Sequence, residues 1–212
     1  MTAPEAAPAP DRSRRRRGGK VPSGREQIID AAIASILEVG FYRSSTNEIA
    51  RRADVSWGAL QYHFGTREAL LLAIVEELAR RFTTSVEAAH VEGESLAERI
   101  TSLYEILAEH YDNPTFLVRL QIVLNLQHDP DTSADVMDAI AAQSAASEAG
   151  TRRLLVEALG PDADPDDHVT LFHALRGMAL SRLYSRTVPV RGTRGPSRAA
   201  RDRFLARLAD GW

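Results

Sequence analysis

Residues 45–68 constrain the fold of this chain more than any other segment, because they place two short helices and a tight turn in succession. Ser45 and Glu48 stand three residues apart, as in a capping box, and predict a first helix that ends near Ala53. Asp54 follows where the chain must turn, and aspartate tolerates the left-handed backbone conformation better than most residues. Helices this short are not stable alone, so further helices must pack against them.

The second short helix is predicted from Trp57 to Phe64, with the hydroxyl of Ser56 as its N-cap. Helical spacing turns Leu60 and Phe64 inward. The outer face then carries Trp57, Gly58, Gln61 and Tyr62. Two short helices joined by a tight turn are typical of a helix-turn-helix, which holds one helix at the angle needed to enter a DNA major groove.

Over about residues 24–75 the chain resembles the N-terminal DNA-binding domain of the tetracycline-repressor (TetR/AcrR) family. The residues that carry the resemblance are Gly40-Phe41, Thr46, Ile49-Ala50, Val55-Ser56, Gly58-Ala59-Leu60, Tyr62-His63-Phe64 and Arg67-Glu68-Ala69-Leu70. The resemblance implies an all-helical homodimer whose C-terminal domain senses a small-molecule inducer and which then releases a DNA operator. Two residues depart from the family pattern, Asp54 in place of a glycine and Gln61 in place of a frequent tyrosine. Glutamine can contact adenine with two hydrogen bonds, which predicts an altered operator preference.

Eight residues are predicted to lie at the DNA, and they divide into backbone contacts and base contacts. Thr46 begins a helix and is expected to bind a phosphate through its hydroxyl and its backbone N–H. By the resemblance, Tyr62, His63 and Arg67 match positions that clamp phosphates, whereas Trp57, Gly58 and Gln61 form the base-facing set. Ser56, the N-cap of their helix, is the remaining candidate for a DNA contact. Two alternatives stay open: His63 as a structural histidine at a helix end, and Trp57 packed against the first helix of the domain.

Charge is distributed unevenly along the chain, although its net value is -3. Residues 1–82 hold 13 Lys and Arg against 10 Asp and Glu, while the remainder holds 13 against 19. The positive end is therefore the end with the helix-turn-helix. Residues 1–22 are predicted to be a disordered basic arm, containing Arg12, Arg14, Arg15, Arg16, Arg17 and Lys20. The arm either tracks phosphates beside the reading helix or serves only as a solvated tail.

The rest of the chain also reads as helical, so the predicted fold class is all-α. Ser23 and Glu26 predict another capping box before a helix that Gly40 stops, with Leu37 on its apolar stripe. The further helices are expected over residues 66–89, 95–111, 114–127, 132–159, 165–186 and 197–208. The helix at 114–127 is apolar around most of its circumference and is predicted to be central, and Phe204, Leu205 and Leu208 are predicted to dock the last helix.

These helices predict a helix-turn-helix domain over residues 23–70 and a helical ligand-sensing and dimerisation domain over residues 71–212. Small residues on the two long helices leave room for a close approach, and Gly177 is unfavourable in a helix interior by about 1 kcal/mol relative to alanine. The alanines are Ala139, Ala141, Ala142, Ala145, Ala146 and Ala149. The resemblance implies a four-helix dimer seam here, which would present two reading helices to successive grooves of a roughly palindromic operator. The alternative is ordinary packing within one chain.

A ligand site is indicated only weakly, by polar residues on the apolar helix around residues 116–126. Arg119, Gln121 and Asn125 are candidates there because buried polar groups require partners, and a bound small molecule can be one. The candidate apolar walls are Tyr104, Phe116, Phe172 and Met178. Core packing or hydrogen bonds between helices would explain the same residues. The six histidines form no pattern that predicts a metal site, and no cofactor is expected.

Two other classes of function remain as alternatives. An enzyme would have to use Asp166, Asp167, His168, His173 or Ser181, but no nucleophile-elbow or phosphate-loop pattern occurs. A helical adaptor would use the short helix pair for protein contacts. The chain has no cysteine, so disulfides and thiolate sites are excluded. No apolar stretch has the roughly 18 residues of a membrane span, so we expect a cytoplasmic protein without membrane contact.

Overall fold

The computed structural model describes residues 24–187 and 196–209. The described residues form α-helices and one short 3-10 helix, and none of them lies in a strand. This confirms the predicted all-α fold class. The elements are α1 (Gly24–Val39), η1 (Phe41–Arg43), α2 (Thr46–Arg52), α3 (Trp57–Phe64), α4 (Arg67–Ala88), α5 (Leu96–Asp112), α6 (Pro114–His128), α7 (Ala134–Leu159), α8 (Pro165–Thr187) and α9 (Arg198–Ala209). The predicted basic arm and the predicted Ser23 cap lie outside the described residues.

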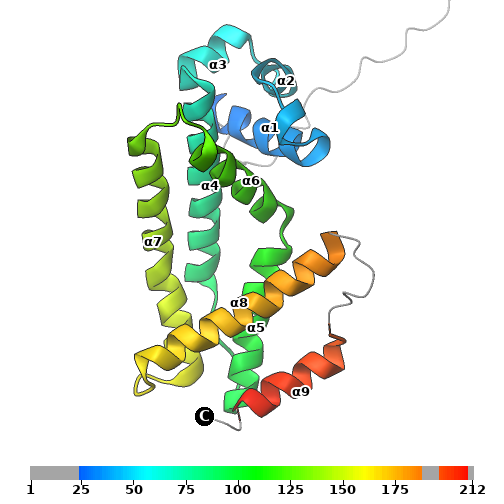
Figure 1. Cartoon of the computed structure of the whole chain (residues 1–212), viewed down its shortest axis with the longest axis vertical. Helices are drawn as coiled ribbons and strands as arrows, with labels where there is room; N and C mark the ends of the chain where they lie inside the picture. The colour runs from blue at the N-terminus through cyan, green and yellow to red at the C-terminus, as the bar shows by residue number, and fades with distance from the viewer. Residues whose placement is uncertain (1–23, 188–195, 210–212) are drawn as a thin grey trace, which may run out of the picture.

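Helices α1 to α3 form one end of the molecule, and α4 runs from them along its long axis beside α7 (Figure 1). Helices α5, α8 and α9 gather at the other end. Local sequence sets the bounds of the first helices. The hydroxyls of Ser45, Ser56 and Thr66 each accept a backbone N–H in the first turn of α2, α3 and α4.

The turn between α2 and α3 has the geometry expected from its sequence. Asp54 has a φ of 51°, in the left-handed region. Among the described residues, the others with a positive φ are glycines. The capping box predicted at α2 has one of its two hydrogen bonds: the Glu48 N–H donates to the Ser45 hydroxyl at 3.2 Å. The Glu48 carboxylate binds Arg51 and Arg52 in place of the Ser45 N–H. These arginines stand on the same helix face and offer the carboxylate charged donors.

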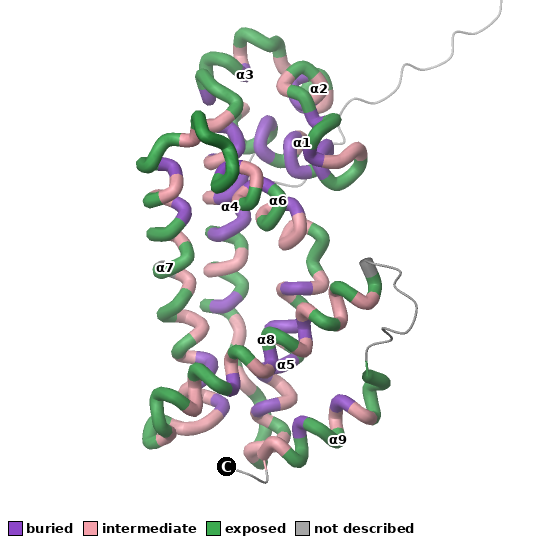
Figure 2. Tube along the Cα trace, in the orientation of Figure 1, coloured by how far each residue is buried: buried purple, intermediate pink, exposed green. Residues whose placement is uncertain are grey.

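Buried residues fall into two cores along the long axis. The first core joins α1, α2, α3 and the upper half of α4 to buried residues of α6 and to Val136 and Ile140 of α7. The second core joins Val86 of α4 to α5, the end of α7, α8 and α9. In Figure 2, buried stretches near both ends of α7 are separated by exposed and intermediate residues. The predicted domain boundary at residues 70–71 lies inside α4 and within the first core.

Some apolar residues lie outside the cores in which the sequence placed them. Leu37 is 46% exposed and Phe204 is 50% exposed, because each stands at the edge of a helical stripe whose centre faces the core. Helix α6 is not central: Val118, Ile122 and Leu126 form its single buried row. Its opposite side exposes Leu120 and Leu124.

The long helix α4 ends at Ala88, close to residue 89, where the sequence predicts its end. Ala89 is its C-cap, and its N–H donates to the carbonyl oxygens of Ser85 and Val86. A non-helical stretch then passes through Gly93, whose φ is 131°, to the Ser95 and Glu98 capping box of α5. An added Cβ at Gly93 would lie 2.5 Å from the Cβ of Glu98, so glycine permits this close turn.

Candidate nucleic-acid interface and ligand site

Helix α3 presents the outer face that its sequence predicts. Trp57 is 57% exposed and Tyr62 is 87% exposed, while Leu60 and Phe64 are buried on the opposite face. Gly58 and Gln61 are also exposed. The nearest atom to an added Cβ at Gly58 is the Ser56 hydroxyl at 3.8 Å, so the backbone is open to close approach at this point. The face is therefore polar and aromatic, with room for a groove wall.

Contacts from α1 hold α3 and its turn in place. The side-chain amide of Gln27 donates to the carbonyl oxygen of Ala53 at 2.8 Å, which fixes the end of α2. The guanidinium of Arg25 lies 5.5 Å from the ring centre of Phe64, which is within cation–π range. His63, in the last turn of α3, lies beside α1, and an added Cβ at Gly24 would lie 3.2 Å from its Nε2. Helix α1 thus fixes the position of α2 and α3.

An ion cluster joins α2 to α1. Arg52 donates to Glu48 at 2.6 Å and to Glu38 of α1 at 2.5 Å. Hydrogen bonds from Arg51 and Arg52 lower the pKa of the Glu48 carboxyl to about 2. Glu48 therefore stays ionised at neutral pH, and the cluster orients α2 relative to α1.

Two predicted DNA contacts already have partners within the protein. Nη1 of Arg67 donates to the carbonyl oxygen of Ser44 at 3.0 Å, and the guanidinium lies 5.4 Å from the ring centre of Phe41. The side-chain amide of Gln61 donates to the carbonyl oxygen of Gly65. Both side chains keep hydrogen-bonding groups beyond these contacts: Arg67 has further N–H donors, and Gln61 has its second amide N–H and its amide oxygen.

Thr46 is the first residue of α2 and is partly exposed, and Ser56 caps α3 from the same side of the turn. The structure thus brings six predicted DNA-contact residues together at α3 and its cap, from Ser56 to His63, and places Arg67 at the start of α4.

The predicted ligand residues do not form one group. Tyr104 is 2% exposed, and its ring faces the guanidinium of Arg201 at 4.8 Å. Gln121 is exposed on α6. Asn125 accepts a hydrogen bond from the hydroxyl of Tyr42 at 3.3 Å and so faces η1. Phe172 and Met178 pack at the margin of the second core.

Phe116 and Arg119 are the predicted ligand residues that lie together near an aromatic cluster on α5. The ring of Phe116 lies 5.6 Å from His110 and 4.9 Å from Tyr111. His110 also stacks on Phe82 of α4 at 3.9 Å. Burial lowers the pKa of His110 to about 4, with smaller contributions from the charges of Arg119 and Arg176, so its ring is neutral at pH 7.

A cleft of about 470 Å³ opens between η1, the start of α4 and the end of α6 with the turn that follows it. Its lining includes Phe41, Arg67, Glu68, Asn125 and Thr132. Beside it, the Glu68 carboxylate accepts the N–H of Ser133 at 3.0 Å. No local pattern in the sequence signals Tyr42 or Ser133, because each pairs with a partner more than 60 positions away.

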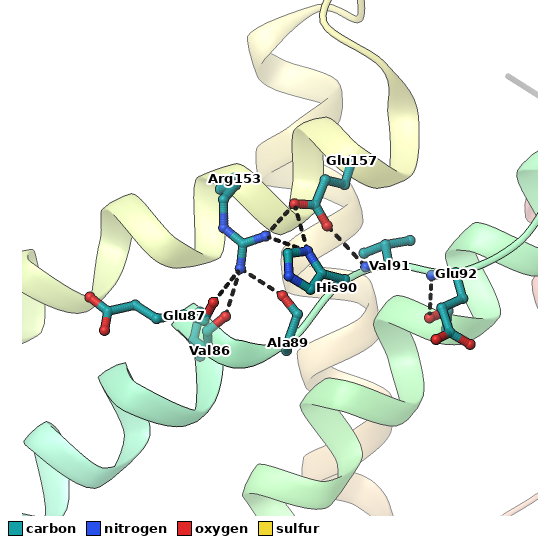
Figure 3. A network of polar contacts seen from close by, with 9 residues as sticks. Val86, Glu87, Ala89, His90, Val91, Glu92, Arg153 and Glu157 are labelled. Carbon is teal, nitrogen blue, oxygen red and sulfur yellow. Dashed lines mark hydrogen bonds and ion pairs between the residues drawn. The ribbon is translucent and has the colours of Figure 1, made fainter.

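At the other end of α4, Arg153 and Glu157 of α7 bind the chain as it leaves the helix (Figure 3). Nη2 of Arg153 donates to the carbonyl oxygens of Val86 and Ala89, each at 2.7 Å. Nη1 of Arg153 pairs with Glu157, whose other oxygen accepts the N–H of Val91 at 2.9 Å. This arrangement satisfies carbonyl groups that a helix end leaves free. Helix α4 is therefore fixed at both ends, to η1 and α7.

No group of three or more His, Asp or Glu in the described part of the chain is arranged to hold a metal ion. Within the same residues, no helix is both long and apolar enough to cross a membrane.

Comparison with known proteins gives a family for the N-terminal part. Residues 28–74 match the family model described as bacterial regulatory proteins, tetR family. The HTH-type transcriptional regulator BetI of Yersinia pestis (strain Pestoides F) is 36% identical over 69 residues, which are 32% of this chain and 35% of BetI. The A-factor receptor protein of Streptomyces griseus is 44% identical over 50 residues, 24% of this chain and 18% of that protein. The matches thus span about a third or less of these relatives' own length.

Solved structures extend the likeness over most of the chain. The multidrug binding protein EbrR in complex with imidazole is 26% identical, with a TM-score of 0.58 over 89% of this chain and 96% of that one. The fatty acid degradation regulator FadR of Bacillus halodurans is 18% identical, with a TM-score of 0.58 over 90% and 96%, and shares the fold.

Proposed function

Because residues 28–74 belong to the tetR family of bacterial regulatory proteins, we propose that this chain is a ligand-responsive DNA-binding transcriptional regulator. It acts as a repressor that binds a roughly palindromic operator as a homodimer and is released by a small-molecule inducer. The observation that carries the proposal is the outer face of α3, which is exposed and lies within the matched segment. Residues 23–70 form the DNA-binding domain and residues 71–212 the sensing and dimerisation domain.

Each residue of the interface takes a role that its position supports. Thr46 and Ser56, at the starts of α2 and α3, lie where helix N-termini favour phosphate. Trp57, Gly58 and Gln61 face the bases, and Tyr62 and His63 contact the backbone beside them. Arg67 holds Ser44 with one nitrogen and offers its other donors to a phosphate.

A dimer seam on α8 is supported by its outer face. Val169 and Tyr184 are 56% and 51% exposed, and Gly177 between them has nothing within 4 Å of an added Cβ. Helical spacing places the three residues on one side of α8. Phe204 of α9 is exposed too, and α8 and α9 both pack on α5 (Figure 1). Large exposed apolar residues favour α9 as the second seam helix over the exposed alanines of α7.

The sensing role draws support from EbrR, whose structure holds a small molecule and whose fold this chain shares over most of its length. The mechanism is a shift between two packings of the sensing domain, transmitted along α4, which changes the separation of the two α3 helices. We assign no catalytic activity, and we place the protein in the cytoplasm, where operator DNA lies.

Selection of bound duplexes from a random DNA pool tests this proposal. We expect a selected sequence with two related half-sites whose centres lie about 34–36 Å apart or a multiple of it. Binding should weaken steeply between about 50 and 200 mM salt, because phosphate contacts release counterions. An adaptor that uses α3 for protein contacts would enrich no sequence and would show little dependence on salt.

A further inference from the structure

A layer of polar side chains separates the two apolar cores. It consists of Thr83 on α4, His110 on α5, Arg119 on α6, and Ser144 and Ser147 on α7. The Thr83 and Ser147 hydroxyls lie 3.1 Å apart, and none of these residues is a member of either core. Five residues from four helices thus place hydrogen-bonding groups between the two cores, with Ser144 at the exposed edge of the layer.

Arg119 is the charged member of this layer. Its Nε is buried and has no hydrogen-bond partner among the described residues. Nη2 has one contact, a long one of 3.4 Å to the Ser144 hydroxyl. Burial lowers the pKa of the guanidinium, and the phenol of Tyr111 is the group that opposes this effect. A buried cation without a counter-charge is unfavourable.

Other arginines of this protein with little exposure have carboxylate partners. Arg201, which is 8% exposed, lies 2.9 Å from Glu105 and 2.8 Å from Asp202. Arg52 binds Glu38 and Glu48. By contrast, the guanidinium of Arg119 forms no ion pair with an acidic residue in the described ranges. The site therefore lacks a negative charge that the fold supplies elsewhere.

The surroundings of Arg119 fit an aromatic anion. Phe82, His110, Tyr111 and Phe116 form a cluster of tilted and edge-on rings, and the charge of Arg119 acts on His110 and Tyr111 within it. His110 is neutral at pH 7, and Arg119 and Arg176 lie close enough for their charges to lower its pKa further. Ser144 is exposed on α7, which leaves the guanidinium end of the site accessible from solvent.

We propose that the molecule sensed by this protein is an organic anion, an aromatic carboxylate, whose carboxylate pairs with Arg119 while its ring packs among Phe82, His110 and Phe116. This inference rests on the proposed function, because it names the chemical class of the inducer. Arg119 is suited to it, since a guanidinium presents parallel N–H donors that match the two oxygens of a carboxylate.

The test uses 1-naphthoate as the anionic probe and 1-naphthamide as its uncharged match, with binding to the full chain measured by calorimetry. We expect naphthoate to bind about tenfold or more tightly than naphthamide, and Arg119→Met to lose about tenfold or more in naphthoate affinity. Arg207→Met, on the exposed side of α9, should leave binding unchanged. Equal binding of acid and amide, no binding of naphthoate, or full binding by Arg119→Met would each overturn the proposal.

A second measurement needs no ligand. Arg119→Met removes the unpaired charge and keeps the volume of the side chain, so we expect a higher Tm than that of the unsubstituted protein. A lowered Tm would show that Arg119 serves the fold and would overturn its assignment as a binding residue. Operator binding without probe is measured separately. If DNA selection succeeds and the naphthoate arms fail, the anion proposal alone falls, whereas the reverse result would refute the regulatory function.

Discussion

The hydroxyl of Tyr42 donates a hydrogen bond to Oδ1 of Asn125 at 3.3 Å, which joins the reading end of the molecule to α6 across 83 positions of sequence. Asn125 lies about 9 Å along α6 from Arg119, at about 1.5 Å of rise per residue. Helix α6 therefore contacts η1 through Asn125 near its C-terminal end and carries the inferred anion site at Arg119 in its N-terminal half.

Arg153 should be a strong contributor to stability, because its guanidinium holds two carbonyl groups at the end of α4 and pairs with Glu157. We expect Arg153→Ala to lower the free energy of unfolding by about 2 kcal/mol, measured by urea denaturation. Its neighbour Arg152 is the matched control, because its side chain is 75% exposed and meets Glu148 at 3.6 Å. Arg152→Ala should change stability by less than about 0.5 kcal/mol. Equal effects of the two substitutions would contradict the role given to Arg153.

Stability should fall as pH is lowered from about 6.5 toward 4, and His110 should be responsible. Burial lowers the pKa of His110 from 6.5 to about 4 in the folded chain, so between these values the unfolded chain binds a proton that the folded chain does not. The free energy of unfolding therefore has its full value above pH 6.5. It decreases as the pH falls toward 4, by at most about 3 kcal/mol.

Replacing His110 with phenylalanine should flatten this pH dependence, because the ring packing remains while the titrating group is gone. His173→Phe, at an exposed position of α8, should leave it in place. The free energy of unfolding of each variant is measured at intervals between pH 4.5 and 7. A His110→Phe variant with the full slope would show that other groups titrate there.

Gly177 provides a test of the dimer seam that separates folding from association. Because nothing lies within 4 Å of an added Cβ, Gly177→Glu fits a single chain, and loss of a mid-helix glycine should favour α8 by about 0.5 kcal/mol or more. In the dimer, the same change buries a glutamate from each subunit at the seam, where the two negative charges repel each other. We expect sedimentation velocity to show monomer for Gly177→Glu and dimer for Ala34→Glu, an exposed control on α1. Dimers in both variants would place the seam on other residues.

The predictable parts of the structure are those that depend on neighbours within a few residues. Ser45, Ser56 and Thr66 cap helices through hydroxyl groups that reach N–H groups three positions ahead, so the sequence predicts where α2, α3 and α4 begin. The left-handed turn at Asp54 is local in the same way. The outer face of α3 follows from its period, given the burial of Leu60 and Phe64.

Other features depend on groups distant in sequence, and no local pattern signals them. The contact of Arg67 with the Ser44 carbonyl and that of Tyr42 with Asn125 exist only once α1, α4 and α6 have packed. For the same reason the sequence predicts a central α6 and the structure does not have one: the composition shows many apolar residues but not that a single row of them faces the core. Asn125 was a ligand candidate on its polarity alone, and its partner is the reading module.

The most direct test of the account is the affinity of a Gln61→Ala/Tyr62→Ala variant for the operator recovered by selection, measured by fluorescence anisotropy. Both side chains are exposed on α3, so the variant should keep its helical content and Tm. We expect operator affinity to fall by about a hundredfold, as for two lost contacts of roughly 1–2 kcal/mol each. Gln127→Ala/His128→Ala, at the exposed end of α6, should bind as tightly as the unsubstituted protein. Operator binding by the α3 variant that equals that of the α6 variant would contradict the claim that this face of α3 reads DNA.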